Sequence, residues 1–263
     1  MKFKYPGSIG EILQGRVKDK DILVSFPVNL FTYVELIDDL FDDGNYKAKN
    51  FSKNLLISWD IEEEVYFKIN STIPKGKGFA SSTADLCALY HCLLKKFNKE
   101  YNQEELIRET IKIEPTDSII FNKACAFDYK NGEYYEELGE YFEFYVWAFE
   151  GEKEIDTVEF NKNVKISLAN VSDLFDELKV AIKNKDIRTL AQISTESIIR
   201  NQQRLPYQIL DDCLWLSRKK GALGLIGAHS GNMLGIVFEK PVYLDVNFKG
   251  YKSYLLKTLK KAF

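Results

Sequence analysis

The chain has 263 residues, 45% of them hydrophobic and 14% aromatic, which corresponds to one large or two small globular domains and argues against an intrinsically disordered chain. Lys and Arg number 36 and Asp and Glu 39, so a net charge of −3 provides no overall positive field for binding nucleic acid. Four cysteines without a C-x-x-C pair, and only two histidines, argue against a zinc site or a disulfide framework. Reduced thiols, together with an N-terminus that lacks the apolar run of a secretory signal, predict a cytoplasmic protein.

The first half of the chain is predicted to contain strands followed by helices. Residues 21–36 are rich in valine, phenylalanine, tyrosine and threonine, which is typical of strands, and Pro27 is expected to interrupt them. After a loop at 74–80, apolar residues recur every three or four positions from Ser81, which predicts an amphipathic helix. The other elements predicted in this half are strands at 54–61 and 64–69 and a helix at 103–113.

The second half is predicted to begin with a strand at 142–149 and to be richer in helix. Gly221 is expected to end one of these helices, and a glycine-rich loop then leads into an apolar strand at 233–238. The uncharged run 221–238 is short, glycine-rich and polar in its middle, so it is not predicted to span a membrane. The predicted helices are 172–183, 187–201, 210–220 and 251–263.

Strands and helices are mixed without strict alternation, which indicates an α+β fold rather than a doubly wound parallel sheet. We predict two domains that meet near residue 140, the first over 1–140 and the second over 141–263.

Residues 74–84, P-K-G-K-G-F-A-S-S-T-A, place glycines and small hydroxyl residues directly before a predicted helix. Glycine lets backbone N–H groups approach a ligand, and a helix N-terminus offers unpaired N–H donors and the positive end of the helix dipole. These features predict a phosphate-binding loop, because capping the helix would require only one of the three hydroxyls. The pattern is neither a Walker A loop nor a dinucleotide fingerprint. The predicted phosphate-binding residues are Lys75, Gly76, Lys77, Gly78, Ala80, Ser81, Ser82 and Thr83.

Two carboxylates three residues apart, Glu114 and Asp117, flank a proline in the segment E-P-T-D-S. Carboxylates and phosphate oxygens are the ligands that Mg²⁺ prefers, and an aspartate near a transferred group is able to accept a hydroxyl proton. Residues 114–117, E-P-T-D, also form a good turn, with the aspartate as its cap. Residue type alone leaves both interpretations open.

A third group of residues, 221–232, has glycines at four positions together with His229 and Ser230. Glycines between a helix and a strand let a ligand or another backbone segment come close. A tight connection between the two elements would also use glycine, although it would need fewer.

In order and spacing, these segments resemble the GHMP kinase superfamily of small-molecule kinases. Its members have an N-terminal motif containing Pro-Gly, a P-x-x-x-G-[LM]-x-S-S-[AT] phosphate loop and a C-terminal glycine-rich motif. Here these correspond to residues 6–11, 74–84 and 224–235. The resemblance implies ATP and Mg²⁺ as cofactors, an N-terminal half like domain 2 of ribosomal protein S5, and a ferredoxin-like C-terminal half.

Within the superfamily, the residues most resemble the L-threonine kinases of cobalamin biosynthesis. The matching segments are P-G-S-I-G-E-I-L-Q-G at 6–15, G-K-G-F-A-S-S-T-A-D at 76–85 and E-P-T-D-S at 114–118. The resemblance implies Ser82 and Glu114 as Mg²⁺ ligands and Asp117 as the base or orienter of the acceptor hydroxyl, so that Asp117 and Ser82 form the catalytic pair. The residues expected at the amino-acid substrate are Glu11, Gln14, Arg200 (or Arg204), His229 and Ser230.

Three alternatives to a threonine kinase follow from the sequence. Another small-alcohol kinase, such as a homoserine kinase, would share every motif. A non-catalytic nucleotide-binding module would keep the glycine loop without needing Glu114 and Asp117, and an RNA-binding protein would need basic and aromatic residues interleaved. We expect a small-molecule substrate and ATP as partners, no nucleic acid and no membrane, and a monomer or a homodimer.

Overall fold

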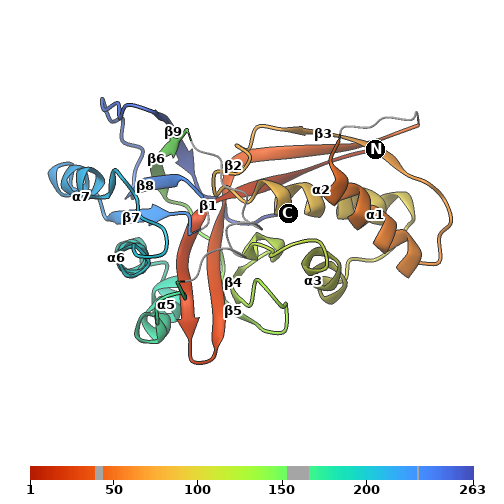
Figure 1. The fold of residues 1–263 in the computed structure, drawn as a ribbon, viewed down its shortest axis with the longest axis horizontal. Helices are drawn as coiled ribbons and strands as arrows, with labels where there is room; N and C mark the ends of the chain where they lie inside the picture. Colours follow the sequence, from red (N-terminus) through yellow and green to blue (C-terminus); the bar gives the residue numbers. More distant parts are fainter. Residues whose placement is uncertain (39–43, 153–165, 230) are drawn as a thin grey trace.

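The computed structural model describes residues 1–38, 44–152, 166–229 and 231–263. Within these residues the strands form one antiparallel sheet in the order β5-β4-β2-β1-β7-β8-β6-β9, and β3 pairs with the end of β2 (Figure 1). The strands are β1 Lys2–Val17, β2 Lys20–Ile37, β3 Tyr66–Ser71, β4 Ala124–Phe127, β5 Tyr135–Gly139, β6 Tyr145–Gly151, β7 Gly224–Gly227, β8 Met233–Phe238 and β9 Tyr251–Lys257.

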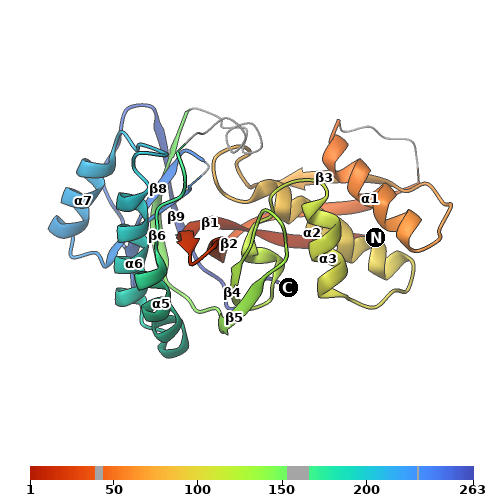
Figure 2. The same ribbon diagram turned by 60° about the horizontal axis from the view of Figure 1, so that its bottom comes forward.

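Two groups of helices lie at opposite ends of the molecule (Figure 2). In the first group α2 packs on β1 and β2, and in the second α6 packs on β1 and β7. No helix among the described residues is long and apolar enough to cross a bilayer. The helices are α1 Tyr46–Ser58, α2 Ser81–Lys96 and α3 Gln103–Ile111 in the first group, and α5 Ser172–Asn184, α6 Ile187–Arg200 and α7 Leu210–Lys219 in the second, with a short 3₁₀ helix, η1, at Ser118–Ile120.

The long hairpin of β1 and β2 bends where its register shifts. The pairing is irregular between Pro6 and Leu13, so the side chains of this stretch do not alternate simply between the two faces. Pro27 lies opposite Ser8 at this irregularity and does not interrupt β2, contrary to expectation. The bend therefore falls on the Pro-Gly motif of the N-terminal segment.

Most elements agree with the sequence, and the predicted α+β class is confirmed. The helices predicted from Ser81 and over 103–113, 172–183, 187–201 and 210–220 are present with ends that agree within two residues. Gly221 follows α7 with φ of +64°, the left-handed conformation expected after a helix C-cap. The strands predicted at 21–36, 64–69, 142–149 and 233–238 correspond to β2, β3, β6 and β8.

The strand predicted at 54–61 is wrong, because these residues belong mainly to α1. The Asn45 side chain accepts a hydrogen bond from the N–H of Ala48 and caps the helix. Phe51 and Leu55 are buried at helical spacing, whereas the short apolar run at 55–57 resembles a strand when viewed alone.

The helix predicted at 251–263 is also wrong, since residues 251–257 form β9 and pair with β6. The glycine-rich segment likewise contains a short strand, β7, which the sequence did not predict. In both cases the neighbouring strand supplies the backbone partner, and a chain read residue by residue does not reveal that partner.

The sheet is continuous across residue 140. Glu11 of β1 pairs with Gly227 of β7, and Val28 forms a bridge with Thr258. Strands from both sides of the boundary therefore share one sheet. The division into domains over 1–140 and 141–263 stays a prediction.

Candidate functional site

Three sequence motifs meet near the middle of the molecule, where β1 passes between the two helix groups (Figure 1). The N–H of Ser8 donates to the carbonyl of Phe79 at 3.0 Å, and the N–H of Gly10 donates to the carbonyl of Gly78 at 3.2 Å. The N–H of Asn232 donates to the carbonyl of Lys77 at 3.1 Å. Backbone hydrogen bonds thus join the N-terminal motif, the loop before α2 and the turn between β7 and β8.

Glycine is required at two of these contacts. A Cβ on Gly78 would lie 2.1 Å from the Cβ of Ala228, and Gly78 has φ of +92°. A Cβ on Gly10 would lie 2.5 Å from the carbonyl carbon of Gly227, and Gly10 has φ of +58°. At both positions the missing Cβ lets protein segments pack on one another, whereas the predicted role of Gly78 at a phosphate stays a prediction.

The N-terminus of α2 is open to a ligand. Its N-cap is Ala80, in the left-handed conformation with φ of 53°, and no side chain caps the helix. The first amide with an intrahelical partner is that of Ala84. The partly exposed hydroxyls of Ser81 and Ser82 have no hydrogen-bond partner among the described residues. Unpaired donors of this kind, at the positive end of a helix, are suited to phosphate.

Lys77 and Thr83, both predicted to bind phosphate, direct their side chains into the protein. The buried Lys77 ammonium donates to the carbonyl oxygens of Gly151 at 3.0 Å and Glu152 at 2.5 Å, at the end of β6. The Thr83 hydroxyl accepts a hydrogen bond from the N–H of Asp117 at 3.1 Å. Lys75, in contrast, is exposed.

Asp117 contacts both the first turn of α2 and the N-terminal motif. Its Oδ2 accepts hydrogen bonds from the hydroxyls of Ser8 at 3.3 Å and Ser25 at 3.1 Å, and its Oδ1 accepts from the N–H of Ile119 at 3.0 Å. Burial, and to a smaller extent the negative charge of Glu11, raises the pKa of Asp117 to about 7. Asp117 therefore caps η1, as the turn interpretation predicts, and also has a proton affinity suited to general base catalysis.

Glu114 lies at the other end of this segment and is buried. Its Oε2 forms an ion pair with Lys47 of α1 at 2.5 Å, whereas its Oε1 has no hydrogen-bond partner in the described part of the chain. Nothing in the sequence linked Lys47 to this carboxylate. Among the described residues no cluster of three or more His, Cys, Asp or Glu side chains could hold a metal ion.

Glu11 and His229 are brought together and buried, although they are far apart in the sequence. Glu11 Oε2 accepts from the backbone N–H of His229 at 2.8 Å and lies 3.2 Å from its Nδ1. The His229 Nε2 lies 3.1 Å from the hydroxyl of Ser197 on α6. Gln14 is buried nearby with its Oε1 unpartnered, and Ser230 lies outside the described residues.

The structure does not bring Arg200 to these residues. Its guanidinium pairs with Asp173 at 2.6 Å and with Glu196 at 2.8 Å on the surface of α5 and α6. It also donates to the carbonyl of Asn170, so its hydrogen-bond partners among the described residues lie outside the group formed by Glu11, Gln14 and His229.

Arg204, the alternative cation, is buried. One of its nitrogens donates to the carbonyl of Ile166 at 2.8 Å. Tyr129, which the sequence did not single out, has a buried hydroxyl with no hydrogen-bond partner among the described residues. It lies near enough to Arg204 and Glu11 to interact electrostatically with both. The N–H of Thr116 donates to the carbonyl of Tyr129, so this tyrosine adjoins the E-P-T-D-S segment. Tyr129 belongs to the site only through contacts that the fold creates, so no sequence motif identifies it.

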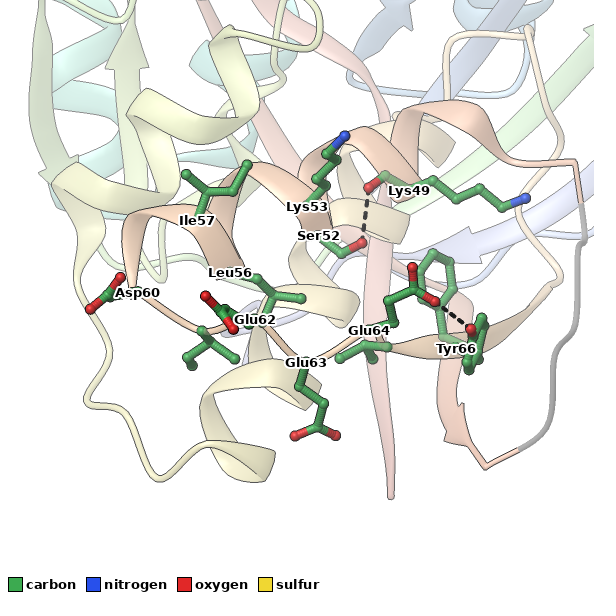
Figure 3. Close-up of a pocket in the computed structure, with 13 residues that line it drawn as sticks. Lys49, Ser52, Lys53, Leu56, Ile57, Asp60, Glu62, Glu63, Glu64 and Tyr66 are labelled. Carbon is green, nitrogen blue, oxygen red and sulfur yellow. Dashed lines mark hydrogen bonds between the residues drawn. The ribbon is translucent and has the colours of Figure 1, made fainter.

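A groove of about 820 Å³ lies elsewhere, between α1 and residues 60–67 (Figure 3). Leu56 and Ile57 contribute apolar surface to it, while Lys53 and Glu62 are among its charged lining residues. A smaller cavity of about 390 Å³ adjoins the glycine-rich turn and includes Gly231 and Tyr207. None of the predicted catalytic or phosphate-binding residues lines either cavity.

The chain is similar in sequence and fold to several known proteins. Residues 46–126 match the family model of the GHMP kinases N terminal domain. An L-threonine kinase of Citrobacter freundii is 25% identical over 245 residues, which cover 89% of this chain and 85% of that protein. An L-threonine kinase of Salmonella typhimurium strain LT2 is 24% identical over 256 residues, covering 93% and 85%. The structure of a homoserine kinase from Cytophaga hutchinsonii superposes with a TM-score of 0.72 at 13% identity, covering 99% of this chain and 95% of that one.

The chain therefore shares the fold of the mevalonate and homoserine kinases on which it superposes, and residues 46–126 are similar to the N-terminal domain of the GHMP kinases. Over most of its length the chain is similar to proteins named L-threonine kinase, at an identity of about one quarter.

Proposed function

We propose that the protein transfers the γ-phosphoryl group of ATP to the side-chain hydroxyl of L-threonine, giving O-phospho-L-threonine for cobalamin biosynthesis. The observation that carries the phosphoryl-transfer proposal is the meeting of an uncapped helix N-terminus with Asp117, whose backbone bonds to the first turn of that helix. The names of the two relatives support threonine as the acceptor.

The loop before α2 supplies the phosphate site in this proposal. Backbone N–H groups at the start of α2 and the hydroxyls of Ser81 and Ser82 face the transferred phosphates, and Lys75 adds positive charge from the exposed side. Phosphoryl transfer depends mainly on positioning and on neutralising charge, which these groups provide. Lys77 acts here by fixing the loop to β6.

In this proposal Ser82 and Glu114 hold the magnesium ion. The unpartnered, buried Oε1 of Glu114 is a hard oxygen acceptor, and the Ser82 hydroxyl is free to bind. Mg²⁺ bound there with phosphate oxygens would neutralise charge on the transferred group. The ion pair with Lys47 holds Glu114 in place through its other oxygen, Oε2.

Asp117 is the candidate base. With its pKa raised to about 7, its carboxylate is available to accept the acceptor's hydroxyl proton at neutral and alkaline pH. The hydroxyls of Ser8 and Ser25 fix the orientation of the carboxylate.

A zwitterionic amino acid needs an acceptor for its ammonium group and a cation for its carboxylate. Glu11 and Gln14 provide acceptor oxygens on one strand, and the buried Arg204, which like Glu11 lies near Tyr129, provides the cation. Arg200, committed to a surface ion-pair network, does not fill this role in the proposal.

The proposal is tested by ATP consumption with L-threonine, L-serine and L-homoserine, with the phosphorylated product identified by ³¹P NMR. L-Threonine should have the highest kcat/KM. Serine lacks one methyl group and should be roughly 10–200-fold poorer. A higher kcat/KM for homoserine would replace threonine by the homoserine-kinase alternative, and absence of turnover on all hydroxylated metabolites would favour a nucleotide-binding module.

A further inference from the structure

A chain of buried hydrogen bonds starts and ends on β1. The N–H of Gln14 donates to the Ser197 hydroxyl at 3.2 Å, this hydroxyl lies 3.1 Å from His229 Nε2, and His229 Nδ1 lies 3.2 Å from Glu11 Oε2. Glu11, His229 and Ser197 are 6%, 3% and 0% exposed. These hydrogen bonds link Glu11 and Gln14, the two residues that supply oxygens to the acceptor in the proposed function.

Elementary chemistry fixes the proton at one end of this chain. An ionised glutamate only accepts hydrogen bonds, so His229 Nδ1 must carry the hydrogen that it shares with Glu11. Nδ1 carries that hydrogen whether or not Nε2 is also protonated. The Ser197 hydroxyl, held by the N–H of Gln14, occupies the Nε2 side and fixes the plane of the ring.

The two oxygens of Glu11 are therefore unequal. Oε2 accepts two hydrogen bonds, from the backbone N–H and the ring of the same histidine. Oε1 has no hydrogen-bond partner among the described residues. A carboxylate held by one oxygen presents the other in a fixed direction, which reduces the ordering cost of binding a cation.

We propose that His229 is a positioning residue that holds Glu11 by Oε2 so that Oε1 receives the ammonium group of the amino-acid acceptor. This inference rests on the proposed function for the identity of the acceptor. His229 does not touch the reacting atoms, and Ser197 supports it from α6.

An activity-independent measurement tests the contact itself. The chain has two histidines, so protein labelled with ¹⁵N-histidine gives two imidazole signals, and His91→Phe assigns them. The ¹⁵N shifts of His229 should show a hydrogen on Nδ1, and Glu11→Gln should change them. An Nε2–H tautomer at His229 would overturn the proposal.

Three substitutions separate positioning from folding. His229→Asn keeps an N–H near the place of Nδ1, His229→Gln places one near Nε2, and His229→Ala has neither. His229→Gln and His229→Ala lose a hydrogen bond to a charged group, so their KM for L-threonine should rise roughly 10–100-fold. The KM for ATP should change less than about twofold in all three variants. The KM for L-threonine of His229→Asn should be close to that of the wild type.

His91→Phe is the matched control, because His91 stacks on Phe3 away from this chain of hydrogen bonds. Equal threonine KM values for the wild type and His229→Ala would overturn the proposal, as would an Asn variant as impaired as the Ala variant. If His229→Ala does not fold, the Asn and Gln variants make the same comparison. If wild-type protein does not phosphorylate threonine, the proposed function fails, and the KM comparison is made with the best amino-acid acceptor.

Discussion

At the scale of single residues, Asp117 combines requirements that oppose one another. A base must be ionised, yet this carboxyl group is withdrawn from water and faces the charge of Glu11, so its pKa rises to about 7. The Ser8 and Ser25 hydroxyls and the Ile119 N–H offset part of that effect. The site therefore keeps Asp117 near the point where it gains and loses a proton at physiological pH.

Asp117→Asn keeps the shape of the side chain and removes its charge. We expect kcat to fall by roughly 10²–10⁴-fold, the usual contribution of a general base, with little change in the KM for ATP. In the wild type, kcat/KM for the acceptor should rise from pH 6 to about 7 and level off above it, because only the ionised carboxylate accepts a proton. A flat profile in steady-state kinetics would remove Asp117 from the proton transfer.

The same substitution should increase stability at alkaline pH. Between about pH 4 and 7 the folded protein retains on Asp117 a proton that the unfolded chain releases, so this group lowers the free energy of unfolding as pH rises through that window. Asp117→Asn removes this loss. Thermal melts should show a Tm above that of the wild type at pH 8 and a smaller difference at pH 4, and the reverse order would contradict the raised pKa.

Ser82→Ala tests the proposed metal ligand. Loss of a group that stabilises charge in the transition state should lower kcat by roughly 10–1000-fold, and a higher Mg²⁺ concentration should be needed for half-maximal activity. Ser58→Ala, at the exposed end of α1, is the control. Turnover close to that of the control would show that Ser82 does not hold the ion.

At the scale of elements, Gly78 is the position where backbone packing is least tolerant. Gly78→Ala meets both a left-handed φ and a Cβ contact of 2.1 Å. Gly221→Ala is a matched control, because Gly221 also has a positive φ but has no atom within 4 Å of the added Cβ. We expect Gly78→Ala to lower the Tm further than Gly221→Ala and to raise the KM for ATP. Equal effects would mean that the loop moves away without cost.

The elements also show what sequence reasoning reaches. The α2 helix and the loop before it were predictable because apolar spacing, glycines and hydroxyls are local signals. The strand character of 251–257 was not, because β9 depends on the edge of β6 for its hydrogen bonds. The same holds within the site: Glu11, Asp117 and His229 were identifiable by type and motif, whereas Lys47, Tyr129 and Ser197 belong to it only through contacts that the fold creates.

At the scale of the whole molecule, the segment after β9 joins the two halves. Thr258 bridges to Val28, and the N–H of Leu259 donates to the carbonyl of Pro27, so the backbone of this segment reaches the first half. Within the second half, the buried Thr258 hydroxyl donates to the carbonyl of Phe142 at 2.8 Å and accepts from the N–H of Phe144 at 2.8 Å. With β1 and β7 also paired, both halves contribute to one continuous sheet.

Thr258→Val keeps the side-chain shape and leaves two buried backbone groups without their partner, which should cost about 1–3 kcal/mol. For a chain of this size the Tm should fall by several degrees. Calorimetry should show a single transition in both proteins, because the two halves share the sheet. Two separated transitions would instead favour independent domains over 1–140 and 141–263.

The backbone hydrogen bonds among the three motifs also bear on how acceptor preference could be changed. Because carbonyl and N–H groups hold residues 8–10, 77–79 and 232 together, the phosphate loop keeps its shape independently of the side chains at the proposed amino-acid end. Gln14 and Arg204 contact the acceptor in our proposal, and Tyr129 lies near Arg204; the side chains of these three residues do not form that backbone framework. A combinatorial library randomised at these three positions should therefore yield kinases with new amino-acid or hydroxy-acid acceptors that retain the parental affinity for ATP.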